Sequence, residues 1–408
     1  MQRKLLIVTS VPLMLRGFLL PFAEHFKDLG WQVDAMVKAD NSTAYKDCEA
    51  VFDKIWNVAW SRSPFDPRNF LSAPKMIRAA LEAEPYDIVH VHSPIAAFVT
   101  RFALRGLRKS KRPKVIYTAH GFHFHREGGR VKNFVFEILE RTAGPWTDKL
   151  VVINREDEAS AKRLKLVPER DLLYMPGIGV DVEKYAARGI TTDQLVEVRS
   201  ELNLAERDRL ILMIAEFNPG KRHADALDAL ALLEERDVVL AFAGVGPLEE
   251  EVKVKAEELG VTDRIRMLGY RRDIPVLLKA SDALLLPSER EGLPRSVLEA
   301  MCAGTPVIST EIRGVEDLLS DDCGLMTPVG DAPAIAKAMR WIADNSEAAK
   351  EMAGRGQEKM KLFSLENVIA LHEDLYEDVL GPQGVEKITM TGLHTNSVNR
   401  LGKTGSAK

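Results

Sequence analysis

Short apolar segments alternate with helix candidates along most of the chain, in two successive series. Such alternation predicts parallel β-sheets covered by helices. A glycine-rich stretch at residues 175–181 interrupts the pattern, and 408 residues are too many for one ordinary hydrophobic core. We therefore expect an α/β protein with two parallel-sheet domains. The expected strands are residues 4–10, 32–37, 87–92, 114–120 and 149–154 in the first series, and 210–217, 238–244, 265–270, 283–287 and 306–310 in the second.

The composition is that of a globular protein in a reducing compartment. Hydrophobic residues make up 46% of the chain and charged residues 28%, as in soluble domains. The cysteines, Cys48, Cys302 and Cys323, are scattered without Cys-x-x-Cys spacing, so neither a zinc site nor redox chemistry is indicated. The sequence has no run of about 18 apolar residues, and its first apolar stretch is too brief for a signal peptide. We expect a cytoplasmic protein.

The net charge of −4 is distributed unevenly. Residues 1–190 hold 30 Lys and Arg against 22 Asp and Glu, a net +8, whereas residues 191–408 hold 26 against 38, a net −12. A basic cluster interleaved with apolar residues at roughly helical spacing is typical of a helix on anionic lipid, or of a solvated helix. Nucleic acid is not an expected partner, because the chain is acidic and carries no such binding motif. The cluster contains Arg101, Arg105, Arg108, Lys109, Lys111, Arg112 and Lys114.

Two carboxylates, Glu291 and Glu299, lie eight positions apart where an expected strand leads through a loop into a helix. Pro294 favours the first helical position, where its missing N–H costs nothing. Ligands of open α/β sheets bind beyond the carboxyl ends of the strands, and the free N–H groups of the next helix, near residues 295–297, attract phosphate. The alternative is a pair of solvated surface glutamates.

Residues 291–299, Glu-Gly-Leu-Pro-Arg-Ser-Val-Leu-Glu, resemble the Glu-x7-Glu motif of retaining nucleotide-sugar glycosyltransferases of family 4, which have the GT-B fold. The resemblance implies two Rossmann-like domains that face each other across a catalytic cleft. It also implies that Glu291 contacts hydroxyls of the donor sugar and that Glu299 accepts hydrogen bonds from both ribose hydroxyls. A carboxylate suits both roles because its two oxygens can accept from adjacent O–H groups. The motif places further donor-binding residues between the glutamates, namely Gly292, Leu293, Arg295 and Ser296.

Two segments of the first half extend the resemblance. Residues 117–125, Tyr-Thr-Ala-His-Gly-Phe-His-Phe-His, resemble the signature of the capsule and exopolysaccharide branch, which points to His120 as the residue that reaches the donor sugar. An imidazole can donate or accept a hydrogen bond at neutral pH; for His123 and His125 we expect structural roles. Gly17 matches the glycine-containing loop that approaches the donor phosphate. This loop lacks the Gly-x-Gly-x-x-Gly spacing of a dinucleotide-binding oxidoreductase.

Phosphate-binding cations are expected within residues 215–223, Ala-Glu-Phe-Asn-Pro-Gly-Lys-Arg-His. Lys221 matches the family's diphosphate-binding lysine, and a lysine there can act as a point charge for phosphate. Glu216 stands where the family usually has an arginine. Arg222 or Arg295 could supply the second cation, and a solvent-facing role is the alternative for both.

Two further expectations come from the same resemblance. Tyr270 and Arg271 lie where the family's loop frames the nucleobase. The chain has no Asp-x-Asp motif, which favours phosphate neutralisation by protein cations. We therefore expect activity without a metal ion or other cofactor.

The resemblance also assigns domains. Residues 1–189 are expected to form an acceptor-binding domain, and residues 190–364 a nucleotide-sugar-binding domain. Residues 365–380 are expected to form a helix that crosses back onto the first domain. The tail, residues 381–408, has too little apolar surface to fold.

The implied function is retaining transfer of a hexose or N-acetylhexosamine from UDP, with GDP-mannose as the next donor candidate. The implied acceptor is a polyprenyl-diphosphate-linked saccharide in surface polysaccharide assembly, whose hydroxyl attacks from the face that the leaving group vacates. The basic first domain, with residues 13–20 and Trp56, Trp60 and Phe65, suits such an acceptor at the inner face of the plasma membrane. A GT-B sugar-nucleotide epimerase and a non-catalytic nucleotide-sugar-binding scaffold are the alternatives.

Overall fold

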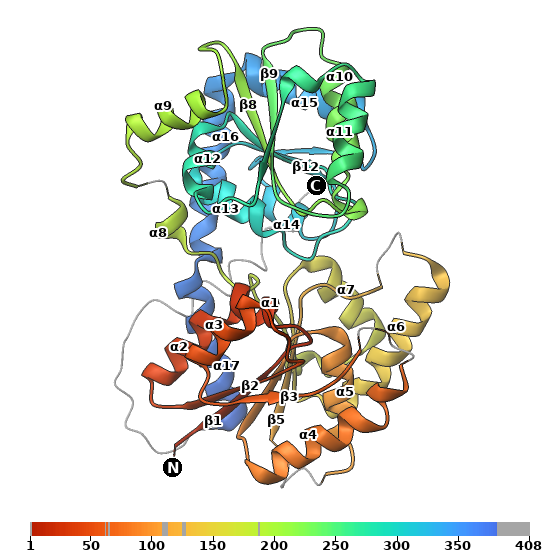
Figure 1. Cartoon of the computed structure of the whole chain (residues 1–408). Helices are drawn as coiled ribbons and strands as arrows, with labels where there is room; N and C mark the ends of the chain where they lie inside the picture. Colours follow the sequence, from red (N-terminus) through yellow and green to blue (C-terminus); the bar gives the residue numbers. More distant parts are fainter. Residues whose placement is uncertain are drawn as a thin grey trace.

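The computed structural model describes residues 2–61, 63, 66–107, 113–124, 128–186 and 188–381. Two α/β domains lie one above the other, as Figure 1 shows. Each is built on a parallel sheet, and this architecture confirms the expected fold class. The expected tail from residue 382 onwards, residues 108–112 of the basic cluster, Phe65 and His125 lie outside the described residues.

The first sheet has seven strands among the described residues, in the order β3-β2-β1-β4-β5-β6-β7. Its strands are β1 (Lys4–Val8), β2 (Gln32–Val37), β3 (Ile55–Asn57), β4 (Ile88–Val91), β5 (Lys114–Ala119), β6 (Lys149–Val152) and β7 (Leu172–Tyr174). The connecting helices are α1 (Pro12–Met14), the π-helix η1 (Leu15–Leu19), α2 (Leu20–Asp28), α3 (Thr43–Val51), α4 (Ser72–Ala83), α5 (Pro94–Leu104), α6 (Arg130–Ala143) and α7 (Arg155–Leu164).

The second sheet has six strands among the described residues, in the order β10-β9-β8-β11-β12-β13. Its strands are β8 (Arg209–Ile214), β9 (Val238–Ala243), β10 (Ile265–Gly269), β11 (Ala283–Leu286), β12 (Val307–Thr310) and β13 (Leu325–Thr327). The helices from the linker onwards are α8 (Val182–Tyr185), α9 (Thr192–Glu201), α10 (His223–Ala231), α11 (Glu249–Glu258), α12 (Ile274–Ala280), α13 (Arg295–Ala303), α14 (Val315–Leu319), α15 (Ala332–Asp344), α16 (Ser346–Lys359) and α17 (Leu365–Leu380).

Every expected strand is present, but most end before the expected last residue. The polar residues that follow β1, β4 and β5, such as His92 and His120, leave the sheet and enter loops. Strands β3, β7 and β13 were not expected. Each has three residues and lies at or beside a sheet edge, and so short a segment carries too little periodicity to be recognised.

Both sheets are covered on two faces. Successive side chains of a strand point to opposite sides, so Leu6 and Val8 of β1 pack with α4 and α5, whereas Leu5 and Ile7 pack with α2 and α17. In the second domain α12 and α13 cover one face of the sheet, and α10, α11 and α15 cover the other.

The three cysteines are buried and free.

The order of the strands reverses between β1 and β4 in the first sheet and between β8 and β11 in the second. At such a switch point the loops after two neighbouring strands separate and leave a crevice. Where the domains meet, the loop after β11 and the start of α13 contact the segments that follow β5 and β1. The sheets therefore direct the candidate residues toward one cleft.

The chain crosses between the domains twice, and the two crossings lie side by side. The N–H of Val180 donates to the carbonyl of Phe363, and the N–H of Leu365 donates back to the carbonyl of Val180. Gly179 has a φ of +78°, and a Cβ there would lie 2.6 Å from the Cα of Leu365. The close approach of the two crossings therefore requires glycine at this position.

Helix α17 follows the second crossing and packs on the first domain. The ring of Tyr376 lies 4.8 Å from that of Phe26, and its hydroxyl lies 2.7 Å from Nδ1 of His90 in β4. Among the described residues, no helix has the length and apolar character needed to cross a bilayer.

Candidate active site

A cavity of about 250 Å³ opens in the second domain at the end of the switch-point strands. We call it the second-domain cavity. Polar side chains from the β8 loop and from the start of α13 line most of it. Its lining residues are Ile214, Ala215, Glu216, Lys221, Glu291, Pro294, Arg295, Ser296 and Glu299.

The local sequence explains how the two glutamates reach this cavity. Strand β11 is a fully buried apolar segment, Ala-Leu-Leu-Leu, and the chain leaves the sheet after Leu286. The expected position of Pro294 was wrong by one residue: its ψ of 118° is extended, so it is the N-cap and Arg295 begins α13. Glu299 lies in the second turn, lines the cavity and is only 6% exposed.

The N-terminus of α13 has no side-chain cap. The first N–H groups of a helix lack partners within the helix and carry partial positive charge. Here they belong to Arg295, Ser296 and Val297, as expected, and Ser296 lines the cavity. The arrangement can bind an anion.

Lys221 and Glu291 both line the cavity and form an ion pair. Nζ of Lys221 donates to Oε1 of Glu291 over 2.5 Å. Lys221 comes from the short 3-10 helix η5 (Pro219–Lys221), which follows β8. Glu216 also lines the cavity, and its carboxylate accepts a hydrogen bond of 3.1 Å from Asn218.

Arg295 connects the second domain to the first. Its Nε donates to Oε1 of Glu299 over 2.8 Å, and its Nη1 donates to the carbonyl of Gly17 over 2.6 Å. Gly17 lies in the π-helix that follows the first strand. Tyr185, from the linker helix α8, hydrogen-bonds the same glutamate, and burial raises the pKa of its hydroxyl.

A second cavity of about 310 Å³, the first-domain cavity, lies beside His120. Nε2 of His120 lies 3.1 Å from Nδ1 of His92, and the rings stack at 5.3 Å. Burial, with a smaller contribution from His372, lowers the pKa of His120 to about 4, so the ring is neutral at physiological pH. The lining residues are Ser10, Met14, His92, Ser93, Pro94, Ile95, His120, Gly121 and His123.

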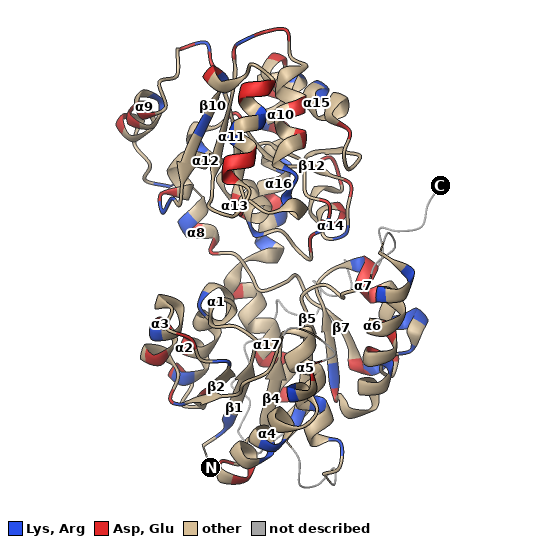
Figure 2. Cartoon of the chain, turned by 45° about the vertical axis from the view of Figure 1, so that its right-hand side comes forward, with Lys and Arg blue, Asp and Glu red and all other residues tan. Residues whose placement is uncertain are grey.

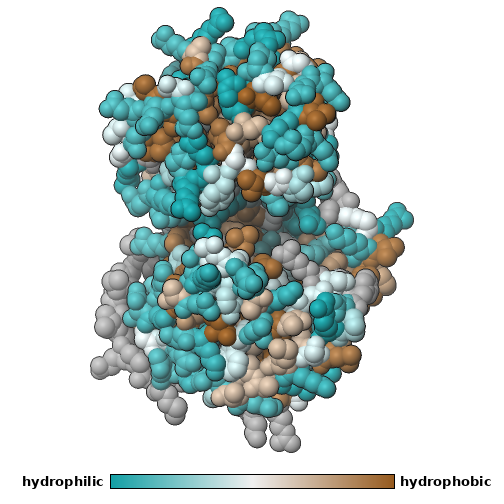
Figure 3. Space-filling view, in the orientation of Figure 1, coloured by the Kyte–Doolittle hydropathy of each residue, from teal (hydrophilic) through white to brown (hydrophobic). Residues whose placement is uncertain are grey.

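The loops that line the two cavities are in contact. A Cβ at Gly292 would lie 2.1 Å from the backbone oxygen of His120, and one at Gly177 would lie 2.5 Å from Cδ2 of Leu293. Leu293 thus packs against the linker. Glycine at position 292 permits the close approach of the two domains at the cleft (Figure 3).

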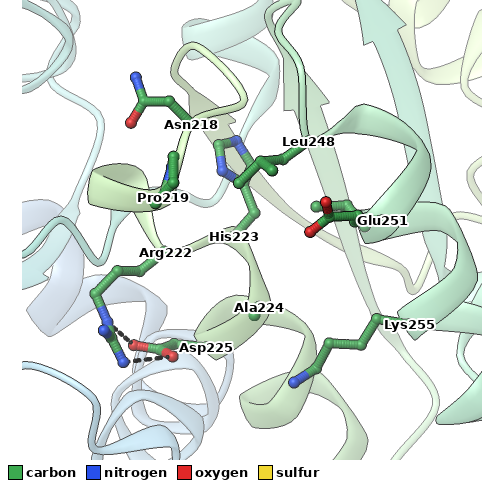
Figure 4. A pocket seen from close by; sticks show the side chains of 10 residues that line it. Asn218, Pro219, Arg222, His223, Ala224, Asp225, Leu248, Glu251 and Lys255 are labelled. Atoms are coloured by element: carbon green, nitrogen blue, oxygen red, sulfur yellow. Dashed lines mark hydrogen bonds and ion pairs between the residues drawn. The ribbon is translucent and has the colours of Figure 1, made fainter.

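Six expected donor-binding residues do not line the second-domain cavity: Gly17, Gly292 and Leu293, whose contacts are given above, and Arg222, Tyr270 and Arg271. The guanidinium of Arg222 is bound by Asp225, with contacts of 2.5 and 2.9 Å, beside a separate cavity between α10 and α11 (Figure 4). Arg271 forms ion pairs with Glu201 and Asp273. Tyr270 is 69% exposed on the loop after β10, at the edge of the sheet.

The structure corrects two expectations about the first domain. Arg101 is 1% exposed and forms a buried ion pair of 2.8 Å with Glu140, so this member of the basic cluster cannot contact lipid. Trp60 is buried in the core and donates to the carbonyl of Ser10 over 3.3 Å, so it cannot bind an acceptor. His123, for which a structural role was expected, lines the first-domain cavity.

His92 and Tyr185 were missed by the sequence reasoning. His92 follows β4 in the sequence Val-His-Val-His, and polar residues at the end of a buried strand are the available signal. Tyr185 carries no local signal, because its partner Glu299 is distant in sequence. No group of three His, Cys, Asp or Glu side chains that could hold a metal ion is found in the part of the chain that the structure describes.

Two parallel-sheet domains that face each other across such a cleft define the GT-B class of glycosyltransferases. A solved structure of Anabaena Alr3699/HepE, in complex with UDP and glucose, has this fold. It superimposes with a TM-score of 0.76 and 17% identity over 92% of this chain and all of that chain.

Sequence comparisons identify the family. The model "Glycosyl transferases group 1" matches residues 196–359, and "Glycosyl transferase 4-like domain" matches residues 18–177. EpsD of Bacillus subtilis (strain 168), assigned by its name to the glycosyltransferases, is 31% identical over 391 residues, which are 95% of this chain and 100% of that protein. The chain therefore belongs to this family of glycosyltransferases.

A further relative is named for its reaction. The Escherichia coli UDP-Gal:alpha-D-GlcNAc-diphosphoundecaprenol alpha-1,3-galactosyltransferase is 30% identical over 271 residues, which are 65% of this chain and 68% of that protein.

Proposed function

We propose that this glycosyltransferase transfers a hexose or N-acetylhexosamine, with retention of anomeric configuration, from a UDP-sugar to a lipid-linked saccharide. The observation that carries the proposal is the second-domain cavity, where Lys221, Glu291, Glu299 and the uncapped start of α13 converge. UDP in the Anabaena structure and the diphosphoundecaprenol acceptor in the name of the E. coli relative support the two substrate classes. Assembly of a surface polysaccharide is the corresponding pathway.

Each group in the cavity has a proposed role. Lys221 and the first N–H groups of α13 bind the diphosphate and offset the charge that develops on it as it leaves. Glu299 accepts from the ribose hydroxyls. Glu291 and His120 orient the sugar, and the acceptor hydroxyl attacks from the side of the departing phosphate. Arg295, already bound to Glu299, is the nearer candidate for a second cation than Arg222.

The reaction is proposed to need no metal ion, because these cations and helix N–H groups can neutralise the diphosphate. Transfer should continue at an unchanged rate in excess EDTA. A loss of activity that Mg²⁺ or Mn²⁺ restores would contradict this part of the proposal.

Acceptor-dependent release of UDP, followed by NMR assignment of the product anomer, tests the reaction. Nucleotide sugars are first screened by thermal shift, since a ligand that binds the folded state raises its apparent stability. We expect Glu291→Ala to abolish release and the product to keep the donor's configuration. Turnover of the donor without any acceptor would favour the sugar-nucleotide epimerase. A rate of UDP release in Glu291→Ala equal to that of the wild type would favour the non-catalytic scaffold or a catalytic site elsewhere.

The exposed face of α6 supports the proposed association with an anionic membrane. Val131, Phe134 and Ile138 are 80%, 64% and 44% exposed and follow helical spacing. Arg130, Lys132 and Arg141 of the same helix are also exposed. Figure 2 shows this basic helix on the flank of the lower domain, where Figure 3 shows hydrophobic side chains. Apolar residues flanked by cations suit an anionic lipid surface.

Flotation with vesicles that contain phosphatidylglycerol tests this surface. Phe134→Glu with Ile138→Glu should abolish flotation. The matched control, Leu232→Glu with Val254→Glu, changes residues that are 55% and 53% exposed on the second domain and should float like the wild type. Unchanged flotation of the α6 variant would contradict the membrane surface. So would a variant mass that light scattering shows to be half that of the wild type, because this face would then be a dimer contact.

A further inference from the structure

A buried ion pair joins the two domains directly behind the cleft. Arg313, in the loop between β12 and α14, is 7% exposed, and Asp157, in the first turn of α7, is 1% exposed. Nη1 of Arg313 lies 2.9 Å from Oδ1 of Asp157. The second domain thus inserts the guanidinium of Arg313 into the first domain.

The guanidinium also holds the backbone of both loops that carry candidate catalytic residues. Its Nη1 donates to the carbonyl of Phe122 over 3.1 Å, and its Nε donates to the carbonyl of Glu291 over 3.3 Å. Phe122 lies two residues after His120. One rigid planar group therefore binds the loop of Glu291 and the loop of His120 at once.

Asp157 is itself fixed within the first domain. Its Oδ2 accepts from the N–H of Phe122 over 3.1 Å and from Nδ2 of Asn154 over 2.9 Å. Nδ2 of Asn154 lies 3.4 Å from the carbonyl of Gly292. Burial raises the pKa of Asp157, and the charge of Arg313 opposes this shift.

The surrounding glycines show how closely the guanidinium is enclosed. A Cβ at Gly121 would lie 3.1 Å from Nη2 of Arg313, and one at Gly314 would lie 2.0 Å from the carbonyl of Gly292. A buried ion pair adds little net stability, because desolvation offsets much of its attraction. Its geometry can still select one arrangement over others, and here that arrangement is the relative position of two domains.

We propose that Arg313 is a positioning residue for transfer. It holds the loop of Glu291 in register with the loop of His120, and Asp157 is its anchor in the first domain. Arg313 itself binds no substrate. The inference rests on the proposed function, because it assumes that Glu291 and His120 act on the same sugar.

The test compares Arg313→Lys and Asp157→Asn with a matched control. A lysine keeps the charge but cannot bind three acceptors in one plane, and asparagine keeps the shape of Asp157 without its charge. The control is Arg101→Lys, which alters another buried pair, Arg101–Glu140, within the first domain. Measurements are kcat and KM for donor and acceptor, UDP affinity by calorimetry and the free energy of unfolding.

We expect Arg313→Lys and Asp157→Asn each to lower kcat about tenfold or more, because small misplacements of reacting groups are costly. UDP affinity should change less than about twofold, since the proposed contacts with Lys221, the start of α13 and Glu299 all lie within the second domain. The double variant should lose less than the product of the single effects, because both changes break one contact. Arg101→Lys should lower stability and leave kcat unchanged.

Arg313→Lys with wild-type kcat would overturn the inference. A loss of kcat in Arg101→Lys as large as that in Arg313→Lys would also overturn it, because the loss would then follow the free energy of unfolding. Glu291→Ala and His120→Ala, measured in parallel, separate this result from failure of the proposed function. If Glu291→Ala and His120→Ala transfer sugar at the wild-type rate, the assignment of the active site is wrong. If those two variants are impaired and Arg313→Lys is not, only the positioning role of Arg313 is wrong.

Discussion

Nζ of Lys221 lies 2.5 Å from Oε1 of Glu291, so the cation proposed for the diphosphate and the carboxylate proposed for the sugar neutralise each other. A phosphate that binds Lys221 must therefore compete with Glu291. This relationship gives the two residues opposite effects on nucleotide binding, although both are proposed to serve transfer.

The first prediction uses this opposition. Lys221→Ala should weaken UDP binding roughly 10- to 100-fold, because a charge-assisted hydrogen bond contributes about 1.5–3 kcal/mol. Glu291→Gln should bind UDP at least as tightly as the wild type, because it frees the ammonium, yet transfer should fall. Calorimetry with UDP and an acceptor assay check the pair. Weaker UDP binding by Glu291→Gln would show that the two side chains do not compete.

The second prediction concerns the ribose. Glu299→Gln should weaken UDP binding about tenfold, since a neutral amide accepts hydrogen bonds less strongly than a carboxylate. Inhibition by inorganic pyrophosphate, which has no ribose, should change little. Competition assays with both ligands make the comparison. An equal loss for both would instead point to displacement of Arg295, whose Nε lies 2.8 Å from Glu299.

The third prediction concerns the contact between the domains at Gly292. A methyl group there would meet the carbonyl of His120, a backbone atom that cannot turn away. Gly292→Ala should lower kcat about tenfold or more, and UDP binding should persist.

Gly354→Ala is the matched control. Gly354 lies in α16 with no atom within 4 Å of an added Cβ. This change should add about 0.5–1 kcal/mol of stability and leave kcat alone. Wild-type transfer by Gly292→Ala would show that the close approach is unnecessary.

The fourth prediction is a loss of stability in acid. Burial lowers the pKa of His372 to about 4, against about 6.5 in an unfolded chain. Below pH 6.5 the unfolded state takes up a proton that the folded state excludes, so the free energy of unfolding is highest above pH 6.5 and falls toward pH 4. For His372 alone the fall between pH 7 and pH 5 is about 2 kcal/mol.

Urea unfolding at pH 7 and pH 5 measures this fall. His90, His92 and His120, also buried with lowered pKa values, should add to it in the wild type. In His372→Gln the fall should be smaller by about 2 kcal/mol. An identical fall in both proteins would place the acid sensitivity elsewhere.

The sequence predicts the sheets well and the junction between the domains poorly. Buried strands such as β11 are continuous apolar segments, and the eight-residue spacing of Glu291 and Glu299 is local. The three-residue strands at the sheet edges carry too little pattern to be recognised. Arg313 and Asp157 lie 156 positions apart, and no local feature of either segment indicates the other.

The cation positions show the same limit. Lys221, which matches the family's diphosphate-binding lysine, lines the cavity, whereas Arg222, its neighbour, turns to Asp225. The φ of Arg222 is +54°, in the left-handed region. Adjacent residues in such a turn point in different directions, so spacing alone could not decide which of them faces the cavity.

Helix α17 completes the hydrophobic core of the first domain, although the whole second domain precedes it in the chain. Val368, Leu375, Tyr376 and Val379 are buried there with residues of β1 and β2. During synthesis the ribosome delivers these four side chains only after every strand of the second sheet has emerged. The usual order of domain folding, from the N-terminus onward, is therefore reversed at its last step. The second domain can close its core first, whereas the core of the first domain is complete only once α17 has left the ribosome.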